Sequence, residues 1–406
     1  MMYAIKAPPT LKGTIQLPAS KSISNRALII HALSYSGAEI SNLSDCDDTR
    51  VMVQALNSGG NNFDIGAAGT AMRFLTAFLS KIVGEWTITG SERMKQRPIA
   101  LLVDALNSLG AKIEYIEKEG FPPLRIFGSA LEGGPITLDG GISSQYISAI
   151  LMVAPTMKNG LTLTLTGNII SKPYILMTLQ LMSDFGVKSQ WKDNTITIAP
   201  QTYQAVAYTV ESDWSAASYW YEMLSLCGKG EIFLQGLQKN SSQGDAKLAE
   251  LFLALGVKTS YKKDGVLISC NGNYTPKFIY NFVEQPDLAQ TFAVTCCLRS
   301  IPFRFSGLQS LKIKETDRIA ALIAELKKLG YVMEETSHGV LEWKGERCHA
   351  DEKICIKTYE DHRMAMAFAP AAFIKDIYIE HPQVVTKSYP TFWTDLANVG
   401  FEITEN

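Results

Sequence analysis

The sequence predicts an α/β protein of two similar domains, each built from three repeated units. Its 406 residues exceed what one ordinary hydrophobic core organises, and typical domain sizes favour two or three domains. One pattern of helices and strand-like segments recurs six times, which is the mark of an internally repeated architecture. A natural boundary lies near residues 210–213, where the fourth repeat follows the strand-like segments TITIAP and AVAYTV.

Each repeat opens with a short polar cluster that leads into an apolar helix. Ser, Thr and Asp are favoured helix N-caps. Six capped helices whose N-termini converged would present free backbone N–H groups and positive dipole ends to an anion, although simple capping would give the same pattern. The openings are Ser20-Lys21-Ser22, Gly69-Thr70, Ser143-Ser144-Gln145, Ser212-Asp213, Pro286-Asp287 and Asp361-His362-Arg363.

A second, amphipathic helix in each repeat ends at a glycine and passes into a strand-like alternation. These glycines, at positions 60, 110, 186, 256, 330 and 400, follow the opening residues by 39 to 44 positions. Successive openings are 49, 74, 69, 74 and 75 residues apart, so each later repeat has room for two helices and several short strands. The predicted domains are residues 20–211, and residues 1–19 with 212–406; residues 14–17 form an edge strand of the second.

Composition and charge exclude several functional classes. The formal charge is −2 with no basic run, which argues against a nucleic-acid partner. No apolar stretch reaches the roughly 18 residues of a membrane span. The seven cysteines form no CxxC pair, which favours reduced thiols in the cytoplasm and argues against zinc or any other metal.

The segment SKSISNR, residues 20–26, is the most specific motif. On a helix Ser22 and Arg26 share one face, with Lys21 near the N-terminus, so the three can bind one anion. A polar cap followed by an exposed arginine is the alternative. Two weaker motifs follow: the small residues 66–70, which let a ligand approach the backbone, and residues 93–97, whose three cations precede a helix-starting Pro98.

Two motifs in the second half combine cations with carboxylates. In residues 312–318, Lys314 and Arg318 are expected on one helical face with Glu315 beside them, able to bind an anion and move a proton. A salt-bridged helix surface is the alternative. Arg363 precedes an almost wholly apolar helix and is therefore expected at the entrance of a buried element.

The cations of these motifs outnumber their carboxylates. Two phosphorylated carboxylates, each carrying about three negative charges, would suit such a site. The cations are Lys21, Arg26, Arg97, Lys314, Arg318, Arg363 and Lys387, and the carboxylates are Asp287 and Glu315.

Eight segments in register resemble the enolpyruvyl transferases of the shikimate pathway, from Lys21 to Lys387. They are SKSISNR, GTAMR, ERMKQRPI, SSQY, SKPY, KETDR, DHRMAMA and TKSYP. The resemblance implies two domains of three βαβαββ-like units each, an inside-out α/β barrel, with the substrates in the interdomain cleft.

The resemblance also assigns residues to the two substrates, residue by residue. It implies that shikimate-3-phosphate contacts Ser22, Arg26, Ser143, Ser144, Gln145, Ser171, Tyr174, Asp287 and Lys314. It implies that phosphoenolpyruvate contacts Lys21, Gly69, Arg97, Gln145, Arg318, Arg363 and Lys387.

The implied reaction is an addition followed by an elimination that needs no cofactor or metal. Protonation of the phosphoenolpyruvate methylene makes C2 cationic, the 5-hydroxyl of shikimate-3-phosphate attacks, and the adduct loses phosphate. Asp287 is the expected base at the hydroxyl, and Glu315 and Lys21 are candidates for proton transfer at the methylene. The enzyme is expected to be a cytoplasmic monomer of aromatic amino acid biosynthesis.

Two residues depart from the usual family pattern beside the phosphoenolpyruvate site: Ala67 stands for Asn and Phe74 for Pro. We expect glyphosate to compete with phosphoenolpyruvate, but less tightly than in members with Asn and Pro. The nearest rival function, the cell-wall enolpyruvyl transferase, carries a reactive cysteine that residues 93–97 lack. A non-catalytic anion-binding clamshell is a further alternative, which Asp287 and Glu315 disfavour because carboxylates weaken anion binding.

Overall fold

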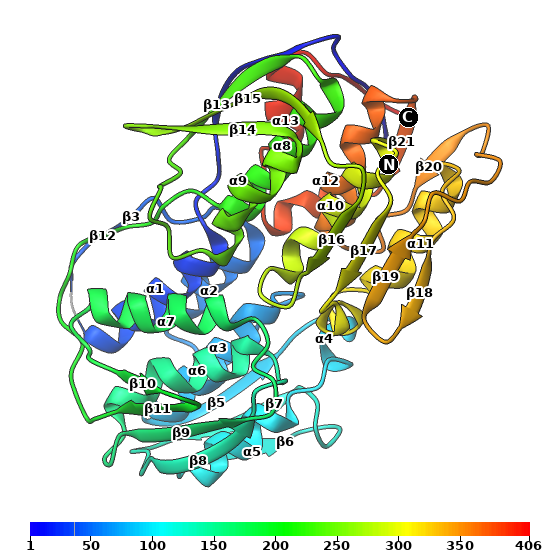
Figure 1. Ribbon diagram of the computed structural model, residues 1–406. Coiled ribbons are helices and arrows are strands. Elements are labelled where there is room, and N and C mark those ends of the chain that lie inside the picture. The colour runs from blue at the N-terminus through cyan, green and yellow to red at the C-terminus, as the bar shows by residue number, and fades with distance from the viewer. Residues whose placement is uncertain (36) are drawn as a thin grey trace. The chain divides into compact units, whose positions relative to one another are not determined.

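The computed structural model describes residues 1–35 and 37–406 and divides the chain into two compact units (Figure 1). The central unit is Ala19–Val210, and the terminal unit combines Met1–Pro18 with Glu211–Asn406. Each unit has its own hydrophobic core, whose members come from that unit alone. No helix in these described ranges is long and apolar enough to cross a membrane.

The terminal unit consists of three βαβαββ repeats, which confirms the repeat that the sequence predicts. In each repeat the first two strands pair in parallel and the last two extend the sheet antiparallel. The first repeat comprises β2 (Leu11–Gln16), α8 (Trp214–Cys227), β13 (Gly230–Gln235), α9 (Leu248–Leu251), β14 (Leu255–Lys262) and β15 (Gly265–Tyr274). The second repeat comprises β16 (Phe278–Asn281), α10 (Ala289–Leu298), β17 (Phe303–Ser306), α11 (Arg318–Lys328), β18 (Glu334–Ser337) and β19 (Val340–Trp343). The third repeat comprises β20 (Ile354–Ile356), α12 (His362–Phe368), β21 (Ile377–Glu380), α13 (Phe392–Asn398), β22 (Glu402–Glu405) and β1 (Met2–Lys6).

The N-terminal segment contributes two strands to the terminal unit. β2 lies at the edge of its sheet, as the sequence predicts. β1, which the sequence analysis does not predict, lies inside another sheet, where Ala4 pairs with Tyr378 of β21 and with Thr404 of β22. The last repeat is therefore completed by the first residues of the chain.

The central unit contains two complete repeats and one reduced repeat. The complete repeats are β4 (Asn62–Asp64), α3 (Gly69–Lys81), β5 (Gly84–Thr89), α5 (Ala100–Ser108), β6 (Lys112–Tyr115) and β7 (Leu124–Gly128), and then β8 (Gly134–Asp139), α6 (Ser144–Val153), β9 (Leu161–Thr166), α7 (Lys172–Asp184), β10 (Gln190–Lys192) and β11 (Thr195–Ile198). The reduced repeat has α1 (Lys21–Ser34), β3 (Ile40–Ser41), α2 (Asp47–Asn57) and β12 (Tyr208–Thr209). Its sheet is only the parallel pair β3–β12, because the 49 residues before the next opening leave no hairpin.

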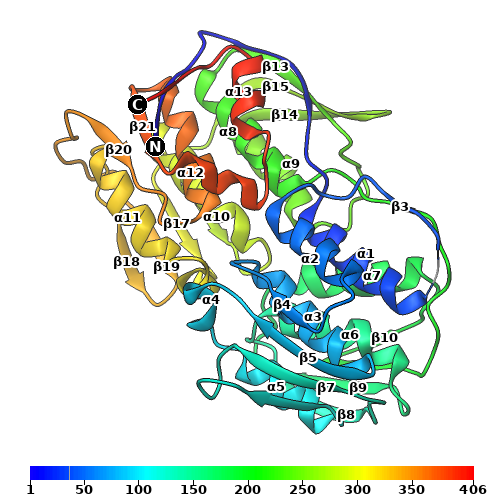
Figure 2. The ribbon, with the colours of Figure 1, turned by 180° about the vertical axis from the view of Figure 1, so that it is seen from behind.

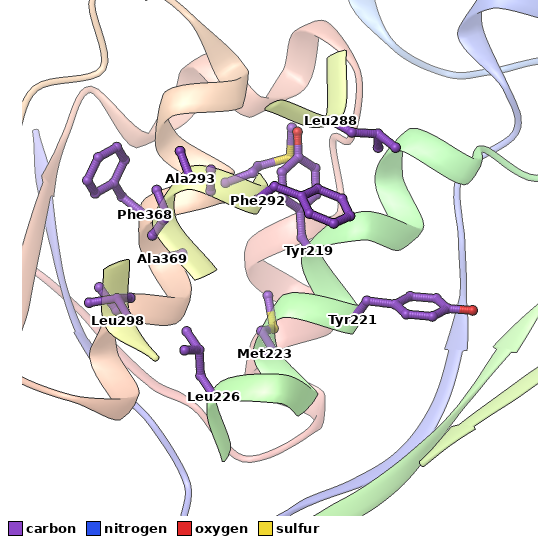
Figure 3. Close-up of a cluster of buried hydrophobic side chains, with 14 of the residues drawn as sticks. Tyr219, Tyr221, Met223, Leu226, Leu288, Phe292, Ala293, Leu298, Phe368 and Ala369 are labelled. Carbon is purple, nitrogen blue, oxygen red and sulfur yellow. The ribbon is translucent and has the colours of Figure 1, made fainter. Parts of the chain in front are cut away.

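The first helix of each repeat, here called an inner helix, lies inside its unit. The inner helices are α1, α3 and α6 in the central unit and α8, α10 and α12 in the terminal unit, and those of one unit pack against one another. Every residue of α10 and α12 is buried. Figure 3 shows side chains of these helices in one cluster of buried hydrophobic residues, among them Tyr219, Phe292 and Phe368. The Tyr221 ring points away from Tyr219 and Phe292, and its hydroxyl is hydrogen-bonded to Thr259 Oγ1 on β14.

The second helices are amphipathic and lie outside the inner helices, as their partly exposed residues show. Most are followed by a glycine in the left-handed region, such as Gly330 with φ 89° after α11. A residue with a Cβ is strained there, so glycine is favoured at the point where the helix turns into the next strand. Five of the six recurring glycines, all but Gly60, therefore have the left-handed conformation where the second helix passes into the following strand.

Candidate active site

The predicted site residues fall into two polar groups, one in each unit, and most of them lie at or near the start of a helix (Figure 2 shows the helices from behind). We call them the central cluster and the terminal cluster. The central cluster holds Lys21, Ser22, Arg26, Gly69, Arg97, Ser143, Ser144, Gln145, Ser171 and Tyr174. The terminal cluster holds Asp287, Lys314, Glu315, Arg318, Arg363 and Lys387.

Arg26 joins three helices of the central unit. Its guanidinium donates to Ser22 O within α1 (2.8 Å), Ser148 Oγ on α6 (3.0 Å) and Thr178 Oγ1 on α7 (2.7 Å). The first of these bonds confirms that residues 22 and 26 share a helical face. Burial lowers the pKa of Arg26 to about 10, and Tyr174 offsets a smaller part of that effect.

Aromatic rings surround the same guanidinium. The Phe74 ring on α3 lies 5.2 Å from Arg26 Cζ, and the Tyr174 ring on α7 lies 6.0 Å away. Phe74 is fully buried. The departure at residue 74 therefore touches a residue that the resemblance assigns to shikimate-3-phosphate, which the sequence analysis did not foresee.

The starts of α3 and α6 lie together in the central cluster. Gln145 Nε2 donates to Thr70 Oγ1 (3.2 Å), and the Ser143 hydroxyl caps α6 by accepting from Gln145 N (3.3 Å). Arg97 lies against the first residue of α3, since a Cβ at Gly69 would be 2.6 Å from Arg97 Nη1. Among the described residues, the buried Arg97 Nε has no hydrogen-bond partner. This cation is therefore poised for an anion at the α3 N-terminus.

The remaining residues of the central cluster begin helices. Lys21 is the first residue of α1, and its Nζ lies 3.7 Å from Asp48 Oδ2. Ser144 begins α6 and is buried. Ser171 precedes α7 with φ 52°, an uncommon conformation for serine that places Pro173 in the first turn.

Arg318 is the centre of the terminal cluster. Its guanidinium contacts Asp361 Oδ2 (2.6 Å), Glu315 Oε2 (2.9 Å) and Asp287 Oδ1 (3.1 Å), although the side chain is only 2% exposed. Burial alone would lower the pKa of Arg318, but these three carboxylates raise it. The cluster thus combines a cation with the two carboxylates, Asp287 and Glu315, that the sequence predicts to be catalytic.

Arg363 contacts Asp287 of the same cluster, and Lys387 contacts the turn that precedes α12. Arg363 Nη2 lies 3.0 Å from Asp287 Oδ2, and its Nη1 donates to Asp287 O (3.2 Å). Arg363 is buried at the start of α12, as the sequence predicts. Lys387 Nζ donates to Glu360 O (3.1 Å).

The expectation that Lys314 and Arg318 share a helical face is wrong. α11 begins at Arg318 because Asp317 caps it, accepting hydrogen bonds from Ile319 N and Ala320 N (both 3.1 Å). Lys314 lies in the preceding irregular segment. Burial lowers the pKa of Lys314, and the charge of Asp287 offsets part of that effect, so Lys314 belongs to the cluster through space.

Pro98 does not start a helix either. A short helix, α4 (Glu92–Lys95), precedes it, and α5 begins two residues later at Ala100. Pro98 O instead accepts a hydrogen bond from the Tyr146 hydroxyl on α6 (2.5 Å). The loop that carries Arg97 is thereby attached to an inner helix.

Two carboxylates of the terminal cluster were missed by sequence reasoning. Asp361 was read only as a helix cap, yet it both caps α12 and pairs with Arg318. Asp245 is buried and hydrogen-bonded to Ser215, and burial together with the charge of Asp287 raises its pKa to about 7. Asp361 belongs to the motif DHRMAMA, which could have drawn attention to it, whereas no motif or spacing in the sequence predicts that Asp245 lies near the site.

The clusters differ in charge balance. The terminal cluster pairs its cations with Asp287, Glu315 and Asp361. The central cluster sets Arg26 among neutral groups. Among residues 1–35 and 37–406 no group of three or more His, Cys, Asp or Glu side chains is arranged to hold a metal ion.

Comparison with known proteins gives consistent matches over the whole chain. A family model described as EPSP synthase (3-phosphoshikimate 1-carboxyvinyltransferase) matches residues 5–63 and 57–396. A 3-phosphoshikimate 1-carboxyvinyltransferase of Bacteroides fragilis (strain YCH46) is 59% identical over 405 residues, covering 99% of both chains. The protein of the same name from Photobacterium damsela subsp. piscicida is 36% identical over 420 residues, covering 96% of this chain and 97% of its own.

Solved structures with the same fold also cover the whole chain. EPSP synthase from Acinetobacter baumannii superposes with a TM-score of 0.79 at 21% identity, covering 100% of both chains. The enolpyruvyl transferase NikO from Streptomyces tendae gives a TM-score of 0.76 at 14% identity, covering 100% of this chain and 98% of its own. At these identities the likeness establishes the fold, and it confirms the predicted α/β architecture.

Proposed function

This chain belongs to the EPSP synthase family, and on that premise we propose that the central and terminal clusters form its active site. The enzyme transfers the enolpyruvyl group of phosphoenolpyruvate to the 5-hydroxyl of shikimate-3-phosphate and releases phosphate. The reaction belongs to the shikimate pathway of aromatic amino acid biosynthesis. The observation that carries the proposed site is the convergence of Arg318, Arg363 and Asp287 within hydrogen-bond distance.

In the proposed division, the central cluster binds the ring substrate. Arg26 is buried, and three hydrogen bonds to neutral oxygens fix its guanidinium, which favours it as the partner of an anionic group. Ser22, Ser143, Ser144, Gln145, Ser171 and Tyr174 would surround that substrate, and Asp287 and Lys314 would complete the set. The two units would act as two domains, 20–211 and the remainder, with the substrates between them.

Phosphoenolpyruvate is assigned to the cations Lys21, Arg97, Arg318, Arg363 and Lys387, with Gly69 and Gln145. Arg97 supports this assignment because its Nε has no partner in the described chain and its Nη1 lies against the α3 N-terminus. Positive groups held in place before the reaction stabilise the charge that develops on the leaving phosphate.

Asp287 is the proposed base at the 5-hydroxyl. Both of its carboxylate oxygens are held by guanidiniums, those of Arg318 and Arg363. Anionic phosphoenolpyruvate would compete for these guanidiniums, and their shift toward the substrate would free an Asp287 oxygen to accept the hydroxyl proton. Glu315 and Lys21 are the candidates for protonating the methylene carbon, Glu315 because it is held 2.9 Å from Arg318.

The test is phosphate release from phosphoenolpyruvate with and without shikimate-3-phosphate. Release that depends on the ring substrate is expected, with no release when a nucleotide-linked amino sugar replaces it. The second acceptor discriminates against the cell-wall transferase. Release with the amino sugar alone, or with neither acceptor, would contradict the proposal.

We also propose that the enzyme is a cytoplasmic monomer. All residues assigned to the two substrates come from one chain, so the site needs no partner subunit. The free thiols of its seven cysteines suit a reducing compartment. Light scattering should give a mass near 44.7 kDa, and twice that mass would contradict the monomer.

A further inference from the structure

A turn of unusual backbone geometry precedes α12 in the terminal unit. Asp361 N donates to Thr358 O (2.8 Å), which closes a four-residue turn. Both central residues have positive φ, 53° for Tyr359 and 56° for Glu360. Glycine, asparagine and aspartate are favoured at such positions, and tyrosine and glutamate are not. The turn therefore stores strain that the surrounding structure must hold.

A buried carboxylate holds the turn. The Tyr359 hydroxyl donates to Glu325 Oε1 (2.7 Å), and Glu325 is fully buried on α11. The other oxygen, Oε2, accepts from Lys328 Nζ (2.6 Å) and from Lys357 N (3.0 Å). These three hydrogen bonds of Glu325 tie α11 to its own last turn, to the segment that leads into the strained turn, and to the turn itself.

The turn contacts the cationic side chains of two residues assigned to phosphoenolpyruvate and the backbone of a third. Glu360 O accepts from Lys387 Nζ (3.1 Å). Asp361, the next residue, pairs with Arg318 (2.6 Å) and caps the helix by accepting from Arg363 N (2.9 Å). Two consecutive residues therefore orient Lys387, Arg318 and Arg363, and the position of both depends on the turn.

We propose that Tyr359 and Glu325 are positioning residues for the phosphoenolpyruvate site, holding the strained turn whose Glu360 carbonyl and Asp361 carboxylate orient Lys387, Arg318 and Arg363. This inference rests on the proposed function. The positioning role of the Tyr359 hydroxyl differs from a purely stabilising role in one measurable respect. A stabilising hydroxyl would change the melting temperature alone, whereas a positioning hydroxyl changes the affinity for one of the two substrates.

Tyr359→Phe tests the inference, since it removes the hydroxyl and keeps the ring. The Michaelis constant for phosphoenolpyruvate should rise about three- to ten-fold. This is the effect expected when one hydrogen bond to a charged group is lost and part of its free energy appears as weaker substrate binding. The Michaelis constant for shikimate-3-phosphate should change by less than about two-fold. The matched control is Tyr221→Phe, which removes a tyrosine hydroxyl bonded to Thr259 Oγ1 (2.7 Å) in the same unit and touches none of the three cations.

A second substitution distinguishes positioning from general damage. Adding Glu360→Gly to Tyr359→Phe removes the strain at one of the two central residues, so the turn depends less on the tyrosine hydroxyl to keep its shape. The double variant should recover most of the affinity for phosphoenolpyruvate. A double variant as impaired as Tyr359→Phe would overturn the inference.

Different results would contradict the proposed function and the positioning role of Tyr359. Absence of turnover in the wild-type chain would overturn the proposed function and this inference with it. An active Tyr359→Phe variant with an unchanged Michaelis constant for phosphoenolpyruvate, or with equal rises for both substrates, would overturn this inference alone.

Discussion

Arg26 and Arg318 are both almost wholly buried, yet their surroundings give them different properties. The Arg26 guanidinium donates to three neutral oxygens of the described residues, and burial lowers its pKa to about 10. Arg318 meets three carboxylates, which raise its pKa. An incoming anion relieves an unbalanced charge at Arg26 but must compete with carboxylates at Arg318.

Asp287→Asn should keep the fold and lose turnover by about a hundred- to ten-thousand-fold, the usual contribution of a general base. The amide cannot accept the hydroxyl proton, although it retains the shape of the carboxylate. Steady-state phosphate release measures the loss. Asp395→Asn is the matched control, because Asp395 lies in the same unit and accepts from Thr391 Oγ1 (2.9 Å) outside the cluster. Near-normal turnover in Asp287→Asn would remove its assigned role.

Glu222 predicts a pH dependence of stability. It is fully buried on α8, and burial raises its pKa well above the usual range, with a smaller opposing effect from Thr295. Below the pKa of this carboxyl in the unfolded chain, about 4.3, Glu222 is neutral in both the folded and the unfolded state, so its ionisation does not lower the free energy of unfolding. As pH rises from there toward the folded-state pKa, the unfolded chain ionises first and stability is lost.

Glu222→Gln should therefore become more stable relative to wild type as pH increases from 5 to 8, by up to about 1.4 kcal/mol per pH unit. Urea unfolding at several pH values measures the difference. Gln290→Leu, which replaces a fully buried neutral residue on α10, is the control and should give a constant difference. A constant difference for Glu222→Gln as well would show that Glu222 does not titrate between the states.

Helix α3 shows how an element links the two substrates of the proposed site. Gly69 at its start faces Arg97, and Phe74, one turn later, lies against Arg26. Arg97 is assigned to phosphoenolpyruvate and Arg26 to shikimate-3-phosphate. A shift of α3 would therefore alter the affinity for both substrates.

The double variant Ala67→Asn with Phe74→Pro should bind glyphosate more tightly, by about three- to ten-fold, roughly one hydrogen bond. Ala67 is exposed just before α3, so an asparagine amide fits there, while proline removes an amide hydrogen and can shift the helix start. Inhibition constants against phosphoenolpyruvate measure the effect, with each single variant as control. An unchanged constant would mean that these two positions do not set the pocket.

At the scale of the whole molecule, the chain passes between its units only twice, between Pro18 and Ala19 and between Val210 and Glu211. Each unit closes its own core, so neither needs the other to bury its apolar residues. Two connections are compatible with hinge motion.

Small-angle scattering should show a smaller radius of gyration when both phosphoenolpyruvate and shikimate-3-phosphate are added, as expected if the substrates bind between closing domains. Each ligand alone, and inorganic sulfate at matched ionic strength, serve as controls. The same radius with and without both substrates would indicate that the domains do not close.

The sequence by itself determined the repeated architecture, the six helix starts and the family, because each of these depends on residues within about one repeat. Capping residues such as Asp213 and Asp361, and the helix-ending glycines, act over a few positions and can be read locally. The spacing of 49 residues after the first opening agrees with the reduced repeat that the structure shows. The order of the eight motifs identified the family, and this needed no information on which motifs are in contact.

Only the tertiary structure decided which of these motifs meet. Arg26 bonds to Ser148 and Thr178, residues 122 and 152 positions away, and Arg318 pairs with Asp361 from the next repeat. β1 enters a sheet formed by the far end of the chain. Such contacts depend on how helices of different repeats pack, and no local preference encodes that packing. For the same reason Asp245 and Tyr359 are visible only once the fold brings their partners together.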